Sequence, residues 1–371
     1  MKKIPLSKPC ISSSSRKSIL NGIDSILESG RLMMGDFTHN FEKSFSEVIG
    51  TRYSVSTSTC TSALQMVLNY FNVAGYEVLV ASASFITDVS VIKWCGATPI
   101  FVEMNPSTLS FDLDDLKSKI TSRTKCVIWV HLTGIISDDY QEIINICKDN
   151  KLKLIEDCSH AHGSSVNGKN AGALGDVGCF SFYPGKIMTS GTGGMVTTNN
   201  MKLAAYVQSA RLFGRCEGSE GKVCIEGNDW FMDEIRACVG YHQLLDLDEN
   251  IKSRRKIAER YNQRLSSLSK FSLIKLKENN MPAYYQYAII LNKEVNRERL
   301  IKAMMSDYGI RTKRIYKPTH TEDIFSDLVQ SEDRLMVTED ILSRSLCLPM
   351  YCQLSMSEVD YICDSLKSTL R

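Results

Sequence analysis

The first two-thirds of this 371-residue chain alternates short runs of apolar, β-branched residues with amphipathic segments. The runs mostly lack polar–apolar alternation, which is typical of strands covered on both faces. They lie at residues 77–81, 99–103, 126–130, 152–156, 178–183 and 194–198. Helical patterns separate several of them, at residues 62–71, 112–120, 140–150 and 201–212. This order predicts an α/β fold around a mainly parallel sheet.

The length of the chain favours two packed domains over one core. A helical pattern runs from Asp233 to Leu268, with a break expected near Asp246. After it come a strand-like segment at 284–291 and a helical segment at 297–309. We therefore expect a large α/β domain over residues 1–245 and a smaller α+β domain over residues 246–371.

Composition excludes several function classes. The 44 basic and 42 acidic residues give a net charge of +2, which favours neither a nucleic-acid nor a membrane partner. The start, MKKIPLSKPC, lacks the apolar run of a signal peptide, and no stretch of 18 apolar residues occurs. The 13 cysteines are scattered without a C-x-x-C pair. Most are expected to be reduced and buried in a cytoplasmic protein.

Ligands of open α/β sheets bind at the carboxyl ends of the strands, and Lys186 follows such a strand. It lies between the apolar segment 178–183 and the glycine-rich segment 191–194. A lone lysine is usually a solvated surface charge, but this position suits a free surface side chain poorly. A desolvated lysine that loses its proton is a nucleophile, and glycines let the backbone lie close to a ligand.

Asp157 follows the segment 152–156, where its carboxylate could face a crevice or simply cap a helix. His160 and His162 have the spacing of metal ligands, but no third ligand is spaced to join them, so no metal site is expected. The hydroxyl-rich run from Ser58 to Ser62 opens a helical segment and suits a phosphate, although plain N-capping also explains it.

Phe85 follows the segment 77–81 and could belong to the core or stack on a ligand. A phosphate cradle, an aromatic ring, a carboxylate and a lysine thus fall in order at the strand ends of one domain. Pyridoxal phosphate (PLP) needs this set: a phosphate anchor, a face for its ring, an acid at the pyridine nitrogen and a lysine for the Schiff base.

Residues 155–199, IEDCSHAHGSSVNGKNAGALGDVGCFSFYPGKIMTSGTGGMVTTN, resemble the DegT/DnrJ/EryC1/StrS family of sugar aminotransferases. The family pattern there is an ED-x-x-Q-A-H-G segment, a G-x-x-G-D segment, and S-F-x-x-x-K followed by G-x-G-G. Further similar stretches are GDFTHNFEKSF, GATPIFVE, VHLTG, MDEIRACVG and IYKPTH, so the likeness covers nearly the whole chain. It implies the fold-type I architecture of PLP-dependent transferases.

The resemblance implies roles for individual residues. Lys186 matches the Schiff-base lysine, and Asp157 matches the partner of the pyridine nitrogen. The remaining cofactor positions fall on Cys60 and Thr61 (backbone N–H groups to the phosphate), Ser181 (phosphate), Phe85 (ring face), His160 (the position of the family's glutamine), and Asn228 and Asp229 (the phosphate of a second subunit). Tyr316 and His320 match a loop near the substrate, with a capped turn as the alternative. A homodimer with shared active sites is therefore expected.

This chain departs from the family pattern at several positions. His160 replaces a glutamine, Asp229 replaces the asparagine that reaches the neighbouring phosphate, and Thr133 replaces a tyrosine. The phosphate loop at residues 58–61 lacks its glycine. An aspartate would repel a phosphate, so either Asn228 takes that role or the register shifts.

The implied reaction is transfer of an amino group from L-glutamate to a keto sugar, typically nucleotide-linked, in surface-polysaccharide or amino-sugar biosynthesis. An aminotransferase for a small phosphorylated ketone or a cyclitol is an alternative. A PLP-dependent sugar dehydratase is disfavoured, because those relatives carry histidine at the position of Lys186. A non-catalytic PLP-binding regulator is disfavoured by the intact Lys186 and Asp157.

Overall fold

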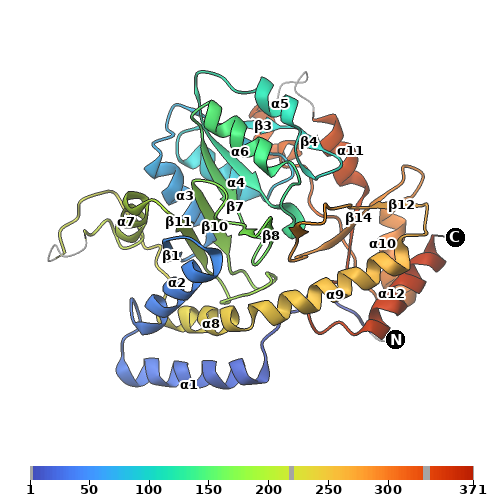
Figure 1. The fold of residues 1–371 in the computed structure, drawn as a ribbon, viewed down its shortest axis with the longest axis horizontal. Helices are drawn as coiled ribbons and strands as arrows, with labels where there is room; N and C mark the ends of the chain where they lie inside the picture. The colour runs from blue at the N-terminus through green and yellow to red at the C-terminus, as the bar shows by residue number, and fades with distance from the viewer. Residues whose placement is uncertain (1–2, 217–220, 329–334, 371) are drawn as a thin grey trace.

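A computed structural model describes residues 3–216, 221–328 and 335–370. Its centre is a seven-stranded sheet in the order β1-β11-β10-β7-β6-β2-β3, seen in Figure 1 between layers of helices. The strands are β1 (Tyr53–Thr57), β2 (Glu77–Ala81), β3 (Thr98–Val102), β6 (Thr124–Val130), β7 (Lys153–Asp157), β10 (Val177–Ser181) and β11 (Gly194–Thr198). Strands β3, β2, β6, β7 and β10 run parallel, and β11 is antiparallel to both of its neighbours. The predicted α/β fold with a mostly parallel sheet is confirmed.

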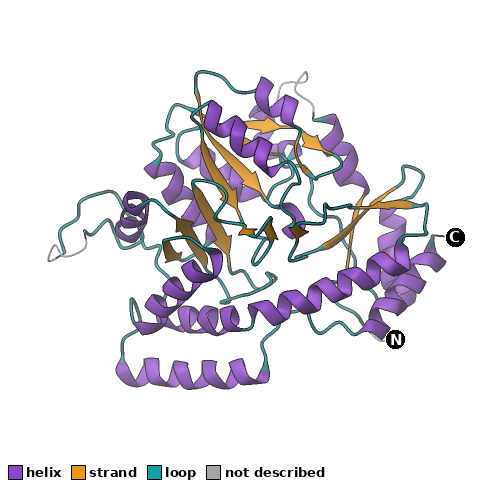
Figure 2. Ribbon diagram, viewed as in Figure 1, coloured by secondary structure: helices purple, strands orange, loops and turns teal. Residues whose placement is uncertain are grey.

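Helices cover both faces of this sheet, as Figure 2 shows. One face packs against α2 (Asp36–Ile49), α5 (Leu113–Ser118), α6 (Tyr140–Asp149) and α8 (Glu234–Leu245). The other packs against α3 (Cys60–Tyr70), α4 (Ile86–Trp94) and α7 (Met201–Ala210). Successive side chains of a strand point to opposite faces, so Leu154 joins the first core and Ile155 the second. Burial on both sides explains the near-continuous apolar runs.

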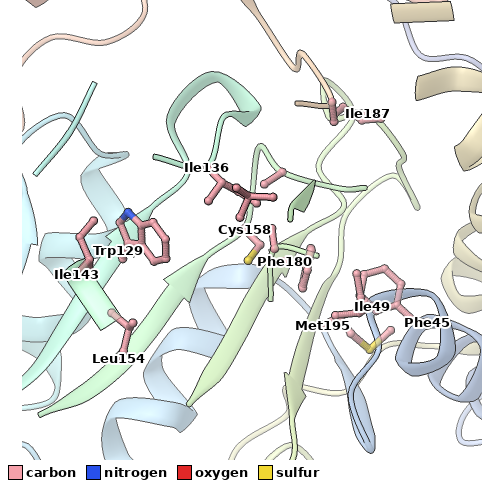
Figure 3. Close-up of a cluster of buried hydrophobic side chains, with 14 of the residues drawn as sticks. Phe45, Ile49, Trp129, Ile136, Ile143, Leu154, Cys158, Phe180, Ile187 and Met195 are labelled. Atoms are coloured by element: carbon pink, nitrogen blue, oxygen red, sulfur yellow. The ribbon is translucent and has the colours of Figure 1, made fainter. Parts of the chain in front are cut away.

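The first of these cores is drawn in Figure 3, where Phe45 of α2 lies beside Met195 of β11. The Phe45 ring meets Phe180 edge-to-face with ring centroids 4.9 Å apart.

Two short hairpins border the sheet: β4 (Met104–Asn105) with β5 (Ser110–Phe111), and β8 (Ser165–Val166) with β9 (Lys169–Asn170). Strand β13 (Asn280–Met281) pairs with β8 and so ties the later part of the chain to the sheet domain.

The helical run is interrupted at Asp246, between α8 and α9 (Leu247–Leu265). Beyond it, a three-stranded antiparallel sheet of β12 (Phe271–Leu273), β14 (Tyr287–Leu291) and β15 (Ser345–Leu348) packs with α9, α10 (Arg297–Tyr308) and α12 (Met356–Thr369). Helix α11 (Met336–Arg344) precedes β15. We propose Asp246 as the boundary between the domains. The N-terminal Ile4 pairs with Ile310 and joins the hydrophobic core of the C-terminal domain, so the first residues pack with that domain.

Helix α1 (Ser13–Ser29) lies against α8 at the edge of the molecule, as Figure 1 shows. No helix in the described ranges is long and apolar enough to cross a membrane.

Nine cysteines are free and buried, as expected for most of the thirteen. Two pairs, Cys10–Cys352 and Cys216–Cys224, form disulfides that the sequence analysis did not predict.

Glu156 is a fully buried carboxylate that holds the β6, β7 and β10 region together. Its Oε1 accepts the backbone N–H groups of Leu174 and Gly175, at 2.8 and 2.7 Å. Its Oε2 accepts the N–H of Gly172 at 2.9 Å and lies 2.8 Å from Nε2 of His131. Each carboxylate oxygen thus has two partners, and the loop before β10 is fixed against β7.

We predict that Glu156→Gln lowers the free energy of unfolding by about 3 kcal/mol. The amide N–H₂ of glutamine is a donor, and it would replace a carboxylate oxygen that now accepts hydrogen bonds from two donors. Chemical denaturation measures this. Glu298→Gln on α10, where the side chain is 74% exposed, is the matched control and should change stability by less than about 0.5 kcal/mol. Equal stability of the two variants would contradict the anchoring role of Glu156.

Candidate active site

A cavity of about 380 Å³ opens at the carboxyl ends of β2, β6, β7 and β10. Eight of the eleven residues singled out from the sequence line it: Cys60, Thr61, Phe85, Asp157, His160, Ser181, Lys186 and Tyr316. These residues span most of the chain length, and the fold brings them to one edge of the sheet. This is the edge where ligands of open α/β sheets bind.

Lys186 lies in the turn that follows β10, where its backbone N–H donates to the carbonyl of Tyr183 at 2.9 Å. Its ammonium faces the cavity, 5.0 Å from the ring centroid of Tyr285. Burial lowers the pKa of Lys186 to about 8, although the nearby Asp157 carboxylate opposes the shift. The side chain is therefore not the solvated surface charge that a lone lysine usually is.

Asp157 is the last residue of β7, and its side chain is only 4% exposed. Its Oδ1 accepts the backbone N–H of Ser159 at 2.9 Å. Residues 158–164 form turns instead of a helix, so Asp157 caps no helix. Its carboxylate lines the same cavity as Lys186.

The N-terminus of α3 forms another wall of the cavity. Thr59 is the N-cap, and its hydroxyl accepts the N–H of Ser62 while Ser62 bonds back to the N–H of Thr59. The first N–H groups of a helix have no partner within the helix. Those of Cys60 and Thr61 are thus available to an anion at the positive end of the helix dipole. Capping and anion binding therefore coexist here, because they use different groups.

The His160 side chain is buried between two tyrosines from the C-terminal part of the chain. Its ring stacks on Tyr285 with centroids 4.1 Å apart, and its Nε2 lies 2.9 Å from the hydroxyl of Tyr316. Burial, with a smaller contribution from the Lys186 charge, holds the pKa of His160 well below its usual value. The imidazole is therefore neutral.

Among the described residues, Asn228, Asp229 and His320 lie outside the lining of this cavity. His320 is buried, with Nδ1 2.6 Å from the Ser82 hydroxyl and Nε2 3.3 Å from Glu339. Asn228 and Asp229 lie in the connection between α7 and α8, where the N–H of Asn228 donates to the carbonyl of Ala210 at 2.9 Å. Figure 1 shows part of this connection extending from the body of the molecule. The Asn228 side chain accepts the N–H of Asp229 at 2.8 Å.

The cavity also contains residues that sequence reasoning missed, above all Asp88, Tyr285 and Lys313. Asp88 lies in the first turn of α4 and resembles an ordinary acidic residue at a helix start. Tyr285 and Lys313 come from the C-terminal part. Lys313 lies two residues before the IYKPTH stretch, which could have pointed to it, whereas none of the similar stretches contains Tyr285.

A model of the DegT/DnrJ/EryC1/StrS aminotransferase family matches residues 13–367. The chain belongs to this family. It is 31% identical to the GDP-perosamine synthase of Escherichia coli O157:H7, over 99% of this chain and 98% of the relative.

Solved structures agree with the family assignment. The aminotransferase TlmJ from Streptoalloteichus hindustanus superposes with a TM-score of 0.91 at 30% identity, over 99% of this chain and 98% of that one. A putative sugar aminotransferase from Streptococcus pneumoniae in its PLP form gives 0.92 at 25% identity, over 99% and 98%. The chain is a PLP-dependent aminotransferase with the predicted fold-type I architecture.

We predict that a small aldehyde, trapped with borohydride in the cofactor-free protein, labels Lys186 at a rate that is half-maximal near pH 8. The neutral amine is the reactive form, and the rate rises as the proton is lost. In Asp157→Asn the midpoint should fall further, since this carboxylate raises the pKa of Lys186. Peptide mapping checks both. A midpoint near the ordinary lysine value of about 10.4 would contradict the desolvated site.

Proposed function

We propose that the enzyme transfers an amino group from L-glutamate to a nucleotide-linked keto sugar, in surface-polysaccharide or amino-sugar biosynthesis. The observation that carries this proposal is the joint placement of Lys186 and Asp157 in one cavity of a chain that belongs to an aminotransferase family. Relatives named for GDP-, dTDP- and UDP-sugar reactions support the substrate class. Because their nucleotides differ, the proposal names no particular nucleotide.

The residues around the cavity fit PLP. The N–H groups of Cys60 and Thr61, with the Ser181 hydroxyl, would hold its phosphate at the start of α3. Asp157 would hold a proton on the pyridine nitrogen, and Phe85 would cover one face of the ring. Lys186 would hold PLP as its Schiff base, and the bound cofactor would supply an electron sink for the carbon that loses a proton.

Lys186 is proposed to move that proton. With a pKa of about 8, about one amine in ten is neutral at pH 7. A neutral amine can take a proton from the α-carbon of the amino donor and pass it to the cofactor, which is general acid–base catalysis. The walls around Lys186 restrict access of water, and this strengthens its interaction with Asp157.

We propose that Tyr316 contacts the substrate. His320 is better explained as a residue that holds the loop of Tyr316 in place. The Tyr316 ring lies 6.1 Å from that of Phe85, which is 52% exposed at the mouth of the cavity. His320 instead joins Ser82, beyond β2, to Glu339 of α11. These contacts favour the capped-turn interpretation for His320, and they hold the loop that carries Tyr316.

Half-reactions test the proposed function. L-Glutamate alone should convert the PLP form to the pyridoxamine phosphate form and release 2-oxoglutarate. A panel of GDP-, dTDP- and UDP-linked keto sugars should then restore the PLP form, as followed by absorbance. Recovery only with a small phosphorylated ketone or a cyclitol precursor would favour that alternative. No conversion by any amino acid would defeat transamination and revive the dehydratase or regulator alternatives.

We also propose a homodimer with shared active sites. The segment that contains Asn228 and Asp229 extends from the body in Figure 1 and lies outside this chain's own cavity. It exposes large apolar side chains, with Phe213 42% and Val223 60% accessible. A second copy would cover these side chains, and Asn228 or Asp229 would then reach the partner's phosphate site.

Subunit mixing tests this. Lys186→Ala and an Asn228→Ala/Asp229→Ala double variant should each be nearly inactive alone. If sites are shared, each hybrid dimer has one intact site, and random mixing should recover about a quarter of wild-type activity. Sedimentation would verify that subunits exchange. Exchange without any recovery of activity would place all functional residues of a site within one subunit.

A cytoplasmic location stays a prediction. It rests on the nine free, buried cysteines, which suit a reducing compartment. The two disulfides, Cys10–Cys352 and Cys216–Cys224, would not persist there.

A further inference from the structure

Asp88 is a buried acid whose place in the cavity the mechanism above does not use. It lies in the first turn of α4, its side chain is 2% exposed, and it lines the cavity with Asp157 and Lys186. Within the described residues, its Oδ2 has no hydrogen-bond donor. A buried ionised oxygen without a donor is costly, so the surroundings disfavour a carboxylate at this position.

The second observation is the contact between two carboxyl groups. The side chains of Asp88 and Asp157 lie within hydrogen-bonding reach of each other. Two buried carboxylates in contact do not both ionise, so such a pair holds one proton. Asp157 accepts the backbone N–H of Ser159, which stabilises its charged form. The proton therefore resides on Asp88.

We propose that Asp88 is a positioning residue: it stays protonated and donates a hydrogen bond to Asp157, which fixes this carboxylate and limits the pair to one negative charge. The proposal rests on the proposed role of Asp157 at the cofactor. A neutral acid serves here as a donor, because an ionised one could only accept. The single charge then remains on the oxygen atoms of Asp157.

The other groups around Asp88 agree with a neutral acid. Burial, followed by the charge of Asp157, holds the pKa of Asp88 well above its usual value. The titratable groups that act on it or feel its charge come from three elements and two loops: Cys60 of α3, Asp157 of β7, Cys179 of β10, Lys186 and Tyr316. Burial raises the pKa of both thiols and of Tyr316, so these groups are neutral. One negative charge on the pair faces the two lysines that line the same cavity, Lys186 and Lys313.

The helix dipole of α4 acts in the opposite direction. Asp88 occupies the first turn, where a negative charge is favoured. This effect is modest and falls off within a turn, whereas a second carboxylate pressed against the first in a buried site shifts a pKa by several units. Repulsion within the pair therefore determines the state of Asp88.

Infrared spectroscopy tests the proton directly, with and without PLP. Wild-type protein should show the carbonyl stretch of a protonated carboxylic acid at neutral pH, shifted in D₂O. Asp88→Asn should lack that band, and Ser90→Ala on the same helix should keep it. Absence of the band from wild type would overturn the proposal. Because this readout needs no substrate, it is independent of whether the proposed transamination occurs.

Stability against pH gives a second readout on the cofactor-free protein. In the unfolded chain Asp88 ionises near pH 3.9, whereas the folded protein holds the proton to higher pH, so wild type loses stability relative to Asp88→Asn as the pH rises. The difference in Tm should be near zero below about pH 3.5 and should grow toward neutral pH. A difference that stays flat or reverses sign would show that Asp88 ionises in the fold.

Activity then separates positioning from packing. Asp88→Ala should lower kcat roughly tenfold or more and shift the pH dependence of the bound cofactor's absorbance, because Asp157 loses a hydrogen bond. Asp88→Asn, which keeps an N–H donor, should recover most of that loss. If Asp88→Asn is as impaired as Asp88→Ala while both remain folded, the acid acts as a charge and the proposal fails.

Discussion

The parallel alignment of β6, β7 and β10 is the constraint on which the cavity depends. Val130 and Cys179 both lie opposite Asp157, so three strands end at one edge. Because β11 returns antiparallel beside β10, the connection that carries Lys186, residues 182–193, must reverse direction and pass the start of α3. Gly194 permits this, since a Cβ there would lie 2.4 Å from the Thr59 carbonyl oxygen. The lysine and the open end of α3 therefore face the same space.

Burial then decides which groups in that space carry charge. It holds the pKa of His160 well below its usual value and raises the pKa of the Cys60 thiol, so both groups are neutral. The charges that remain are those of Lys186, Lys313 and the Asp157 carboxylate. In a desolvated pocket such charges interact strongly and need little reorganisation during a reaction. The same burial lowers the pKa of Lys186 to about 8, so the side chain can both gain and lose a proton near neutral pH.

The sequence determined the sheet and the motif residues better than it determined the rest of the cavity. Strands buried on both faces produce apolar runs that can be recognised, whereas β1, with the sequence YSVST, has serine or threonine at three of its five positions and was not predicted. Residues next to a motif, such as Asp157 and Lys186, reach the cavity through local geometry. Tyr285 reaches it only through packing between distant segments, whereas Asp88 follows Phe85 by three residues and reaches it with the first turn of α4. His320 matched a motif, yet its ring nitrogens are engaged by Ser82 and Glu339.

The departure at His160 shows how the C-terminal part completes the site. Helix α9 carries Arg254, which is 2% exposed and donates to the carbonyl of Tyr284 at 3.0 Å. Tyr284 has a φ of 51°, an uncommon backbone conformation that this contact helps to hold. The turn directs the next residue, Tyr285, onto His160 and over Lys186. The His160 imidazole stacks on this ring and Lys186 lies over it, so the environment of the lysine depends on the packing of α9 against the loop before β14.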